Sequence, residues 1–154
     1  MTDKKPLSTQ ATDVDVPLKP DAPIETFQFA HGFFKPLLFV CGLVNFSAIE
    51  LFGGADPRLA VKMSWGFSSS IPLRSIQEVE RLPDYATYSA GVHTNLNGSW
   101  VVNGSLNNLV VLKVNPSVPA RSAFIPGKVS RLTLSVVDPD RFVASLRRAM
   151  AEAA

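Results

Sequence analysis

The feature that most constrains this chain is a series of short apolar runs, separated by turn-forming residues, that begins near residue 27. The clearest run covers residues 58–64 and places Leu59, Val61 and Met63 on one side, with small or polar residues between them. Side chains two positions apart share one face of a strand, so this run predicts a half-buried strand. Several such runs with turn signals between them are typical of an all-β sandwich or barrel.

Seven further segments have the length and composition of strands. Together with the run above, the predicted strands cover residues 46–52, 58–64, 67–73, 76–82, 91–94, 100–102, 108–114 and 129–137. The turn cluster at 53–57 should join the first two in a hairpin, and Asn97-Gly98 favours the positive φ values of a tight turn. We therefore expect a mainly β domain, a small antiparallel barrel or sandwich of about seven or eight strands.

Three independent signals mark the start of a helix after the last strand. Asp138 can cap the helix, Pro139 suits its first position, and Asp140 places an acidic side chain in the first turn. The apolar positions that follow share one stripe: Phe142, Val143, Leu146 and Met150. We expect this helix to close one open end of the β structure, with Phe142 and Leu146 pointing into the core.

The first 24 residues differ in composition from the rest. They contain four prolines among charged and polar residues, which predicts a disordered tail, residues 1–24, before a single domain, residues 25–154. No apolar stretch follows their basic residues, so we expect no secretory signal and a cytoplasmic protein. With 46% hydrophobic and 18% charged residues, the whole chain falls in the globular range.

The most apolar segment, 33–52, has to be tested as a membrane span. Between Pro36 and Glu50 it offers about fourteen residues, interrupted by Asn45, whereas a span needs about 20. We expect a buried pair of strands here and no transmembrane segment. Cys41, the only cysteine, lies in this apolar run, and we expect it to be buried and reduced.

Several motifs of the chain resemble those of one group of proteins. The motifs are Phe27-Gln28-Phe29-Ala30, Gly42-Leu43-Val44, the Ile-Pro-Leu-Arg-Ser-Ile sequence at 71–76, Val102-Asn103-Gly104-Ser105 and Asp138-Pro139. Together with the strand pattern and the closing helix, they resemble bacterial pleckstrin-homology-like (PH-like) barrel domains, and in particular a group of uncharacterised actinobacterial proteins, over most of residues 27–150. The resemblance implies the fold and no particular activity. Phosphoinositide-binding members have basic residues around their first hairpin, whereas the corresponding hairpin here offers only Arg58 and Lys62, beside Glu50.

Few residues could take part in catalysis. His31 and His93 are the residues whose side-chain type has an unperturbed pKa near neutral, and a small enzyme could use a barrel-mouth pocket with His93 or Asp84. Cys41 could act as a nucleophile, but its apolar neighbours favour a structural role. Two histidines without a cysteine or carboxylate at ligand spacing predict no metal site, and no nucleotide-binding or hydrolase motif occurs. We therefore expect a non-enzymatic protein without catalytic residues or cofactors.

Two residue groups could mediate binding. Trp65 and Trp100 could anchor a partner, although their apolar neighbours favour the core. The net charge of +2 is too small to indicate a nucleic-acid partner. The C-terminal third is nevertheless basic and could form an anion-attracting surface, which would consist of Lys113, Arg121, Lys128, Arg131, Arg141, Arg147 and Arg148.

Three functions follow as hypotheses. The leading one is a binding or scaffold module of PH-like fold, whose ligand the sequence does not define. The second is peripheral binding to a membrane or another anionic surface through the basic C-terminal third and exposed aromatic residues, where each basic residue contributes about 1 kcal/mol. The third is the small enzyme described above. We therefore expect the partner to be a protein or an anionic lipid surface.

Overall fold

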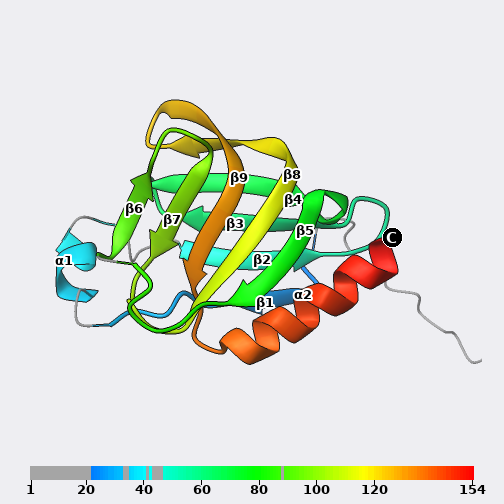
Figure 1. Ribbon diagram of the computed structural model, residues 1–154, viewed down its shortest axis with the longest axis horizontal. Coiled ribbons are helices and arrows are strands. Elements are labelled where there is room, and N and C mark those ends of the chain that lie inside the picture. Colours follow the sequence, from blue (N-terminus) through cyan, green and yellow to red (C-terminus); the bar gives the residue numbers. More distant parts are fainter. Residues whose placement is uncertain (1–21, 33–34, 41, 43–46, 88) are drawn as a thin grey trace, which may run out of the picture.

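The computed structural model describes residues 22–32, 35–40, 42, 47–87 and 89–154, and it is mainly β with one long C-terminal helix (Figure 1). The strands are β1 (Glu25–Phe27), β2 (Ser47–Phe52), β3 (Arg58–Met63), β4 (Phe67–Pro72), β5 (Ile76–Arg81), β6 (Gly91–Thr94), β7 (Ser99–Asn103), β8 (Leu109–Ser122) and β9 (Ile125–Ser135). The helical elements are α1 (Lys35–Val40), the 3-10 turn η1 (Leu73–Ser75) and α2 (Pro139–Ala153). Each predicted strand range overlaps one observed strand, and the prediction of a mainly β domain with a C-terminal helix is confirmed.

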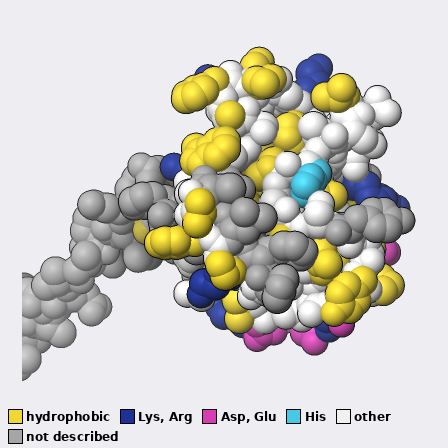
Figure 2. Space-filling view, turned by 90° about the vertical axis from the view of Figure 1, so that its left-hand side faces the viewer, with side chains coloured by type: hydrophobic (Ala, Val, Ile, Leu, Met, Phe, Trp, Pro, Cys, Tyr) yellow, Lys and Arg dark blue, Asp and Glu magenta, His cyan; other side chains and the backbone are white. Residues whose placement is uncertain are grey.

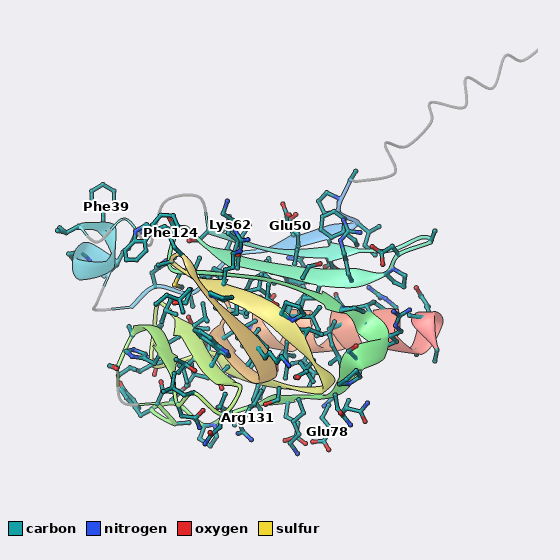
Figure 3. All side chains as sticks on the ribbon, turned by 90° about the horizontal axis from the view of Figure 1, so that it is seen from above. Phe39, Glu50, Lys62, Glu78, Phe124 and Arg131 are labelled. Carbon is teal, nitrogen blue, oxygen red and sulfur yellow. The ribbon has the colours of Figure 1, made fainter. Side chains whose placement is uncertain are left out.

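The strands form two layers that cross at a steep angle (Figures 1 and 3). One layer contains β1 to β4 as antiparallel neighbours, and the other contains β5, β8, β9, β7 and β6 in that order. β8 belongs to both layers, because residues 110–114 pair with β5 and residues 120–121 pair with β4. The long β8–β9 hairpin is therefore the element that joins the two layers.

The hydrophobic core fills the space between the layers. In β3, Leu59, Val61 and Met63 are at most 1% exposed, as their alternation predicts. The rings of Phe67 on β4 and Trp100 on β7 meet across the core, with centroids 5.3 Å apart. Each fully buried side chain of this size contributes about 1.5–3 kcal/mol, so the core is the main source of stability.

The helix α2 begins as its sequence predicts. The Asp138 carboxylate accepts a hydrogen bond from the Arg141 backbone N–H at 3.2 Å. Phe142 and Leu146 are fully buried, and the Phe142 ring lies 5.0 Å from the Phe27 ring in an edge-to-face arrangement. The helix lies along β5 and covers the core between β5 and β1 (Figure 1).

Residues 28–32 cross from β1 to the other layer through isolated bridges to Val136 and Gly104. The Ser135 hydroxyl donates to the Ala30 carbonyl at 2.9 Å and accepts from the Gly104 N–H at 2.8 Å. A Cβ at Gly104 would lie 2.6 Å from the Ala30 carbonyl oxygen. This close crossing of two backbone segments therefore requires glycine.

Two features differ from the predicted barrel. The nine-stranded sheet is not closed, and β7 runs parallel to β9, whereas we expected only antiparallel pairs. The parallel pair arises because residues 104–108 reverse the chain into β8 and the next turn reverses it again into β9. β1 and the 115–128 part of the hairpin lie outside the predicted strands. Prolines at 116, 119 and 126 argue against a strand there, because proline cannot donate to a ladder.

The predicted pair of buried strands over residues 33–52 is wrong in its first half. α1 forms there, and Phe39 and Val40 are 60% and 82% exposed. Pro36 accounts for the difference, because proline fits the first turn of a helix but cannot donate to a strand ladder. The predicted burial of Cys41 lies outside the described residues. Among the helices that are described, none is long and apolar enough to span a membrane.

The predicted domain boundary at residue 24 falls directly before β1. Ile24 already donates a backbone hydrogen bond to the Leu51 carbonyl at 2.8 Å. Residues 1–21 of the predicted tail lie outside the described residues, so their disorder stays a prediction.

Candidate binding surface

Large hydrophobic side chains are exposed mainly at one end of the molecule. Nine are exposed among the described residues, and six of these lie on α1, in three turns or directly beside one of these turns, at the left of Figure 1. These six, the tip residues, are Phe39 (60% exposed), Val40 (82%), Trp65 (59%), Leu96 (90%), Phe124 (98%) and Ile125 (71%). The described segments that carry them, 35–40 with Gly42, 63–67, 94–99 and 121–128, are named the loop end below.

Backbone contacts hold the loop end together. The Ala123 N–H donates to the Trp65 carbonyl at 3.0 Å, which joins the β8–β9 turn to the β3–β4 turn. The Ser130 N–H donates to the Gly98 carbonyl at 2.8 Å and fixes the β6–β7 turn against β9. A Cβ at Gly42 would lie 3.3 Å from Trp65 Nε1, so the chain after α1 lies beside the same turn. The tip residues therefore belong to one surface, which faces the viewer in Figure 2.

The charge of the loop end has one sign. Its four segments contain three basic residues, Lys35, Arg121 and Lys128, and no Asp or Glu. All three are exposed, and none forms an ion pair within the part of the chain that the structure describes. Figure 2 shows Asp and Glu side chains only at the margin of this face. The loop end thus combines exposed apolar tips with unpaired positive charge.

Leu96 occupies an unfavourable backbone conformation in the β6–β7 turn. Its φ of 66° lies in the left-handed region, which costs a residue with a Cβ about 1–2 kcal/mol. The turn is fixed by hydrogen bonds from the Leu96 N–H to Thr94 Oγ1 (3.2 Å) and from the Asn97 N–H to Asn95 Oδ1 (3.0 Å). An exposed leucine at a position that suits glycine or asparagine adds strain without burial, which makes its side chain a candidate contact group.

A hollow of about 380 Å³ opens between the β6–β7 turn and the β8–β9 hairpin. Its lining includes Leu96, Trp100 and Ile125, together with Lys128. The Trp100 indole N–H donates to the Lys128 carbonyl at 2.8 Å, which fixes the ring beside the hollow. The hollow is therefore bordered by two tip residues and by Lys128, which forms no ion pair with any described residue.

A second hollow, of about 720 Å³, lies on the outer face of β2, β3, β4 and the hairpin. Lys62 and Arg121 lie on either side of Ser68 in register across β3, β4 and β8. Glu50 lines the same hollow, and Figure 3 shows Glu50 and Lys62 projecting from the same face. Because both signs of charge are present, this hollow has no clear preference for an anion.

The structure distributes the seven basic residues of the predicted anion-attracting surface over three regions. Arg121 and Lys128 lie at the loop end. Lys113 and Arg131 are register partners on β8 and β9, and Lys113 pairs with Glu78 at 2.6 Å. Figure 3 shows Arg131 and Glu78 projecting from the same layer. The remaining three lie on α2: Arg141, Arg147 and Arg148. One surface formed by all seven stays a prediction.

The residues predicted for the enzyme hypothesis have separate partners. His93 lies on β6, with its Nε2 3.0 Å from the Ser89 hydroxyl. The Asp84 carboxylate accepts a hydrogen bond from the Asn108 N–H at 3.3 Å. Neither residue lines either hollow, so the enzyme hypothesis gains no support from them.

His31 lies in the segment that crosses between the layers, and its Nε2 is buried with no hydrogen-bond partner among the described residues. Burial lowers the pKa of His31, and the positive charge of Lys35 lowers it further, while a hydrogen bond with the Phe29 backbone acts in the opposite direction. The neutral form is therefore favoured more than in an exposed histidine. We therefore expect His31 to affect the pH dependence of stability and do not place it in the candidate binding surface.

The predicted core location is confirmed for Trp100, which is 6% exposed, and is wrong for Trp65. Trp65 lies in the short turn between β3 and β4, where its side chain is 59% exposed. Of the tip residues, only Trp65 was predicted as a possible partner contact, whereas Phe39 and Val40 lie in the run that was predicted to be buried. The signal that could have identified Leu96 is its place beside Asn97-Gly98, because a large apolar residue in a tight turn has little core to enter.

Comparison with known proteins gives no functional assignment, because no family model, curated protein or solved structure matches the chain. The resemblance to PH-like domains therefore stays a prediction. The functional argument depends on the loop end itself.

Proposed function

We propose that this protein is a binding module of PH-like architecture that attaches to anionic membrane surfaces through its loop end. One observation carries the proposal: six exposed tip residues coincide with three basic residues that form no ion pair with any described residue, and no acidic residue occurs in the same segments. Clustered apolar exposure of this kind is typical of protein or membrane contact sites. The positive charge favours an anionic partner.

Both contributions to membrane binding are present at the loop end. Apolar area transferred from water into the interface gains about 25 cal/mol per Å². Tryptophan is also enriched at the boundary between lipid and water, and Trp65 is 59% exposed here. Each of the three basic residues adds about 1 kcal/mol near an anionic leaflet. Because no single contribution is large, the binding should be reversible and sensitive to salt.

The shape of the loop end favours lipid over a protein partner. The tip residues protrude from separate turns, and Phe124 and Leu96 are 98% and 90% exposed. Protein interfaces surround their most important side chains with packed, complementary pockets. The interfacial layer of a bilayer accepts separate apolar groups without such a match. Phe39 and Phe124 lie at the same end of the molecule in Figure 3, where one flat surface could contact both.

Vesicle flotation tests the proposal with the full chain. The protein should float with vesicles of phosphatidylcholine and phosphatidylglycerol, should not float with phosphatidylcholine alone, and should be released by added salt. Phe124→Ser should weaken binding at least about tenfold, since burying a phenylalanine contributes about 1.5–3 kcal/mol. Tyr85→Ser is the matched control, because Tyr85 is 70% exposed and lies outside the loop end. Equal effects of the two substitutions, or no flotation at all, would overturn the proposal and favour a protein partner.

A second pair of variants tests the charge. Arg121→Gln removes a cation from the loop end, whereas Arg148→Gln removes an exposed cation from α2. We expect the first to weaken flotation about fivefold, which corresponds to about 1 kcal/mol, and the second to leave it unchanged. The opposite order would place the contact on α2 and contradict attachment through the loop end.

A further inference from the structure

We propose that the hollow between the β6–β7 turn and the β8–β9 hairpin binds one acyl chain of an anionic lipid, with the head group beside Lys128. This inference rests on the proposed membrane attachment and specifies what the loop end recognises. A surface that attaches by charge and apolar tips alone would not distinguish lipids by their chains, whereas a hollow that takes one chain would.

The position of the hollow fits a ligand that arrives from a membrane. Leu96 and Ile125 border it on opposite elements, and both are tip residues that would contact the lipid surface. Its volume of about 380 Å³ lies at the lower end of the range of about 300–1,000 Å³ that is usual for small-molecule sites. A single flexible chain is therefore a better match than a folded segment of a protein.

The polar groups of the lining leave little for a polar ligand to bind. Thr94 Oγ1 already donates to the Ser99 carbonyl at 3.1 Å, and the Trp100 N–H is bonded to the Lys128 carbonyl. Ser122 and the Lys128 side chain are the other side-chain polar groups in the lining. An acyl chain can contact the part of the lining whose polar groups are already hydrogen-bonded within the protein. The Lys128 ammonium can then pair with the carboxylate or phosphate at the end of that acyl chain.

Glycines on both walls maintain the hollow. A Cβ at Gly127 would lie 3.0 Å from Trp100 Cζ2, so a side chain there would press on the indole. Gly98 has a φ of 83°, and a Cβ at this position would lie 2.6 Å from Ser130 Oγ. The two glycines therefore let the turn and the hairpin approach each other while Trp100 keeps its place between them.

Tryptophan fluorescence can report on this hollow directly. Trp65→Phe leaves Trp100 as the only tryptophan of the chain. In that background, a bromine-substituted fatty acid, used as a monomer below its micelle concentration, should quench Trp100 fluorescence with a saturable dependence on concentration. Phosphatidylglycerol vesicles with brominated chains form the second arm, which distinguishes a free fatty acid from a chain that belongs to a membrane phospholipid.

Two substitutions on the same strand give a matched comparison. Ser122→Leu adds bulk to the lining of the hollow, whereas Ser117→Leu makes the same change on an exposed part of β8 outside it. We expect the first to weaken quenching by the monomeric fatty acid at least tenfold and the second to leave it unchanged. Absence of saturable quenching, or equal quenching in both variants, overturns the inference.

Lys128→Gln provides a test that does not depend on repacking. It should weaken binding of the fatty acid and leave binding of the uncharged alcohol of equal chain length unchanged. If Ser122→Leu fails to fold, equal acid binding by Lys128→Gln and the parent protein overturns the inference. The two proposals can fail separately. Anionic-vesicle flotation without saturable quenching contradicts only the acyl-chain site, and quenching without flotation contradicts only the membrane attachment.

Discussion

The loop end and the side covered by α2, named the helix side below, differ in whether their apolar side chains are buried or exposed. On the helix side, Phe142 and Leu146 are fully buried, and Phe142 contacts Phe27. At the loop end, Phe124 is 98% exposed and no described element covers it. The same chain thus covers apolar surface completely in one region and leaves it open in another. The exposure of apolar side chains at the loop end is therefore specific to that region, because the same chain buries such side chains fully on the helix side.

The two regions also differ in how their charges are arranged. On the helix side, Arg141 pairs with Glu25 at 2.8 Å and Arg81 pairs with Asp140 at 3.1 Å. The basic residues of the loop end have no such partners among the described residues. Paired charges attract external ions weakly, because each neutralises the other. The contrast is in the acidic residues: α2 carries Asp140 and Glu152, whereas the loop-end segments carry none, so the loop end is the region with positive charge alone.

The largest expected difference concerns two phenylalanines. Phe142→Ala should lower the free energy of unfolding by about 3–5 kcal/mol, through lost burial and a residual cavity. Phe124→Ala should change it by less than about 0.5 kcal/mol, because the side chain is already in water. Urea denaturation of both variants measures the contrast. Equal destabilisation would show that the Phe124 side chain packs in solution, and the distinction between the two regions would then fail.

The helix side could be predicted well from the sequence, because its signals are local. Asp138 and Pro139 mark the start of α2, and the spacing of Phe142 and Leu146 marks its buried face. β3 was predicted equally well, since alternation is visible within seven residues. Each of these features depends on neighbours a few positions away, which the sequence lists directly.

The loop end could not be predicted in the same way. The exposure of Trp65 depends on which elements cover its turn, and that is decided by strands far away in the sequence. α1 is too short for a helical period to distinguish it from a strand. The prolines of the β8–β9 hairpin argued against strands in this part of the sequence, although these strands bring Phe124 next to the Trp65 turn. The region that the sequence did not predict therefore depends on long-range topology, including the parallel β7–β9 pair.

The cap of α2 gives the next largest effect. Asp138→Ala removes the acceptor of the Arg141 N–H and should lower the free energy of unfolding by about 0.5–2 kcal/mol. Urea denaturation should show this loss while the far-ultraviolet circular dichroism of the β structure is retained. Asp138→Asn is the matched control, because asparagine also caps helices and should restore most of the loss. No loss in the alanine variant would mean that the helix side does not depend on its cap.

A substitution of Leu96 should change protein stability and vesicle binding in opposite directions. Leu96→Asn should raise the free energy of unfolding by up to about 1 kcal/mol, since asparagine tolerates positive φ better than leucine. It should also weaken flotation with anionic vesicles, because an apolar tip is lost. Thermal unfolding and flotation of the same preparation measure both effects. A variant that is less stable and binds equally well would contradict the assignment of Leu96 as a contact residue.

The smallest effect concerns His31, which lies next to the loop end in sequence and has a lowered pKa because of burial. In the unfolded chain it should titrate near about 6.5. As the pH falls below that value, the unfolded state binds a proton more readily than the folded state, so stability decreases with falling pH until the folded-state pKa is passed. His31→Gln should therefore flatten the dependence of the unfolding midpoint on pH between about 7.5 and 5.5. If His31→Gln keeps the full slope of the parent protein, the buried Nε2 of His31 does not resist protonation, and the crossing segment that leads to the loop end is open to solvent.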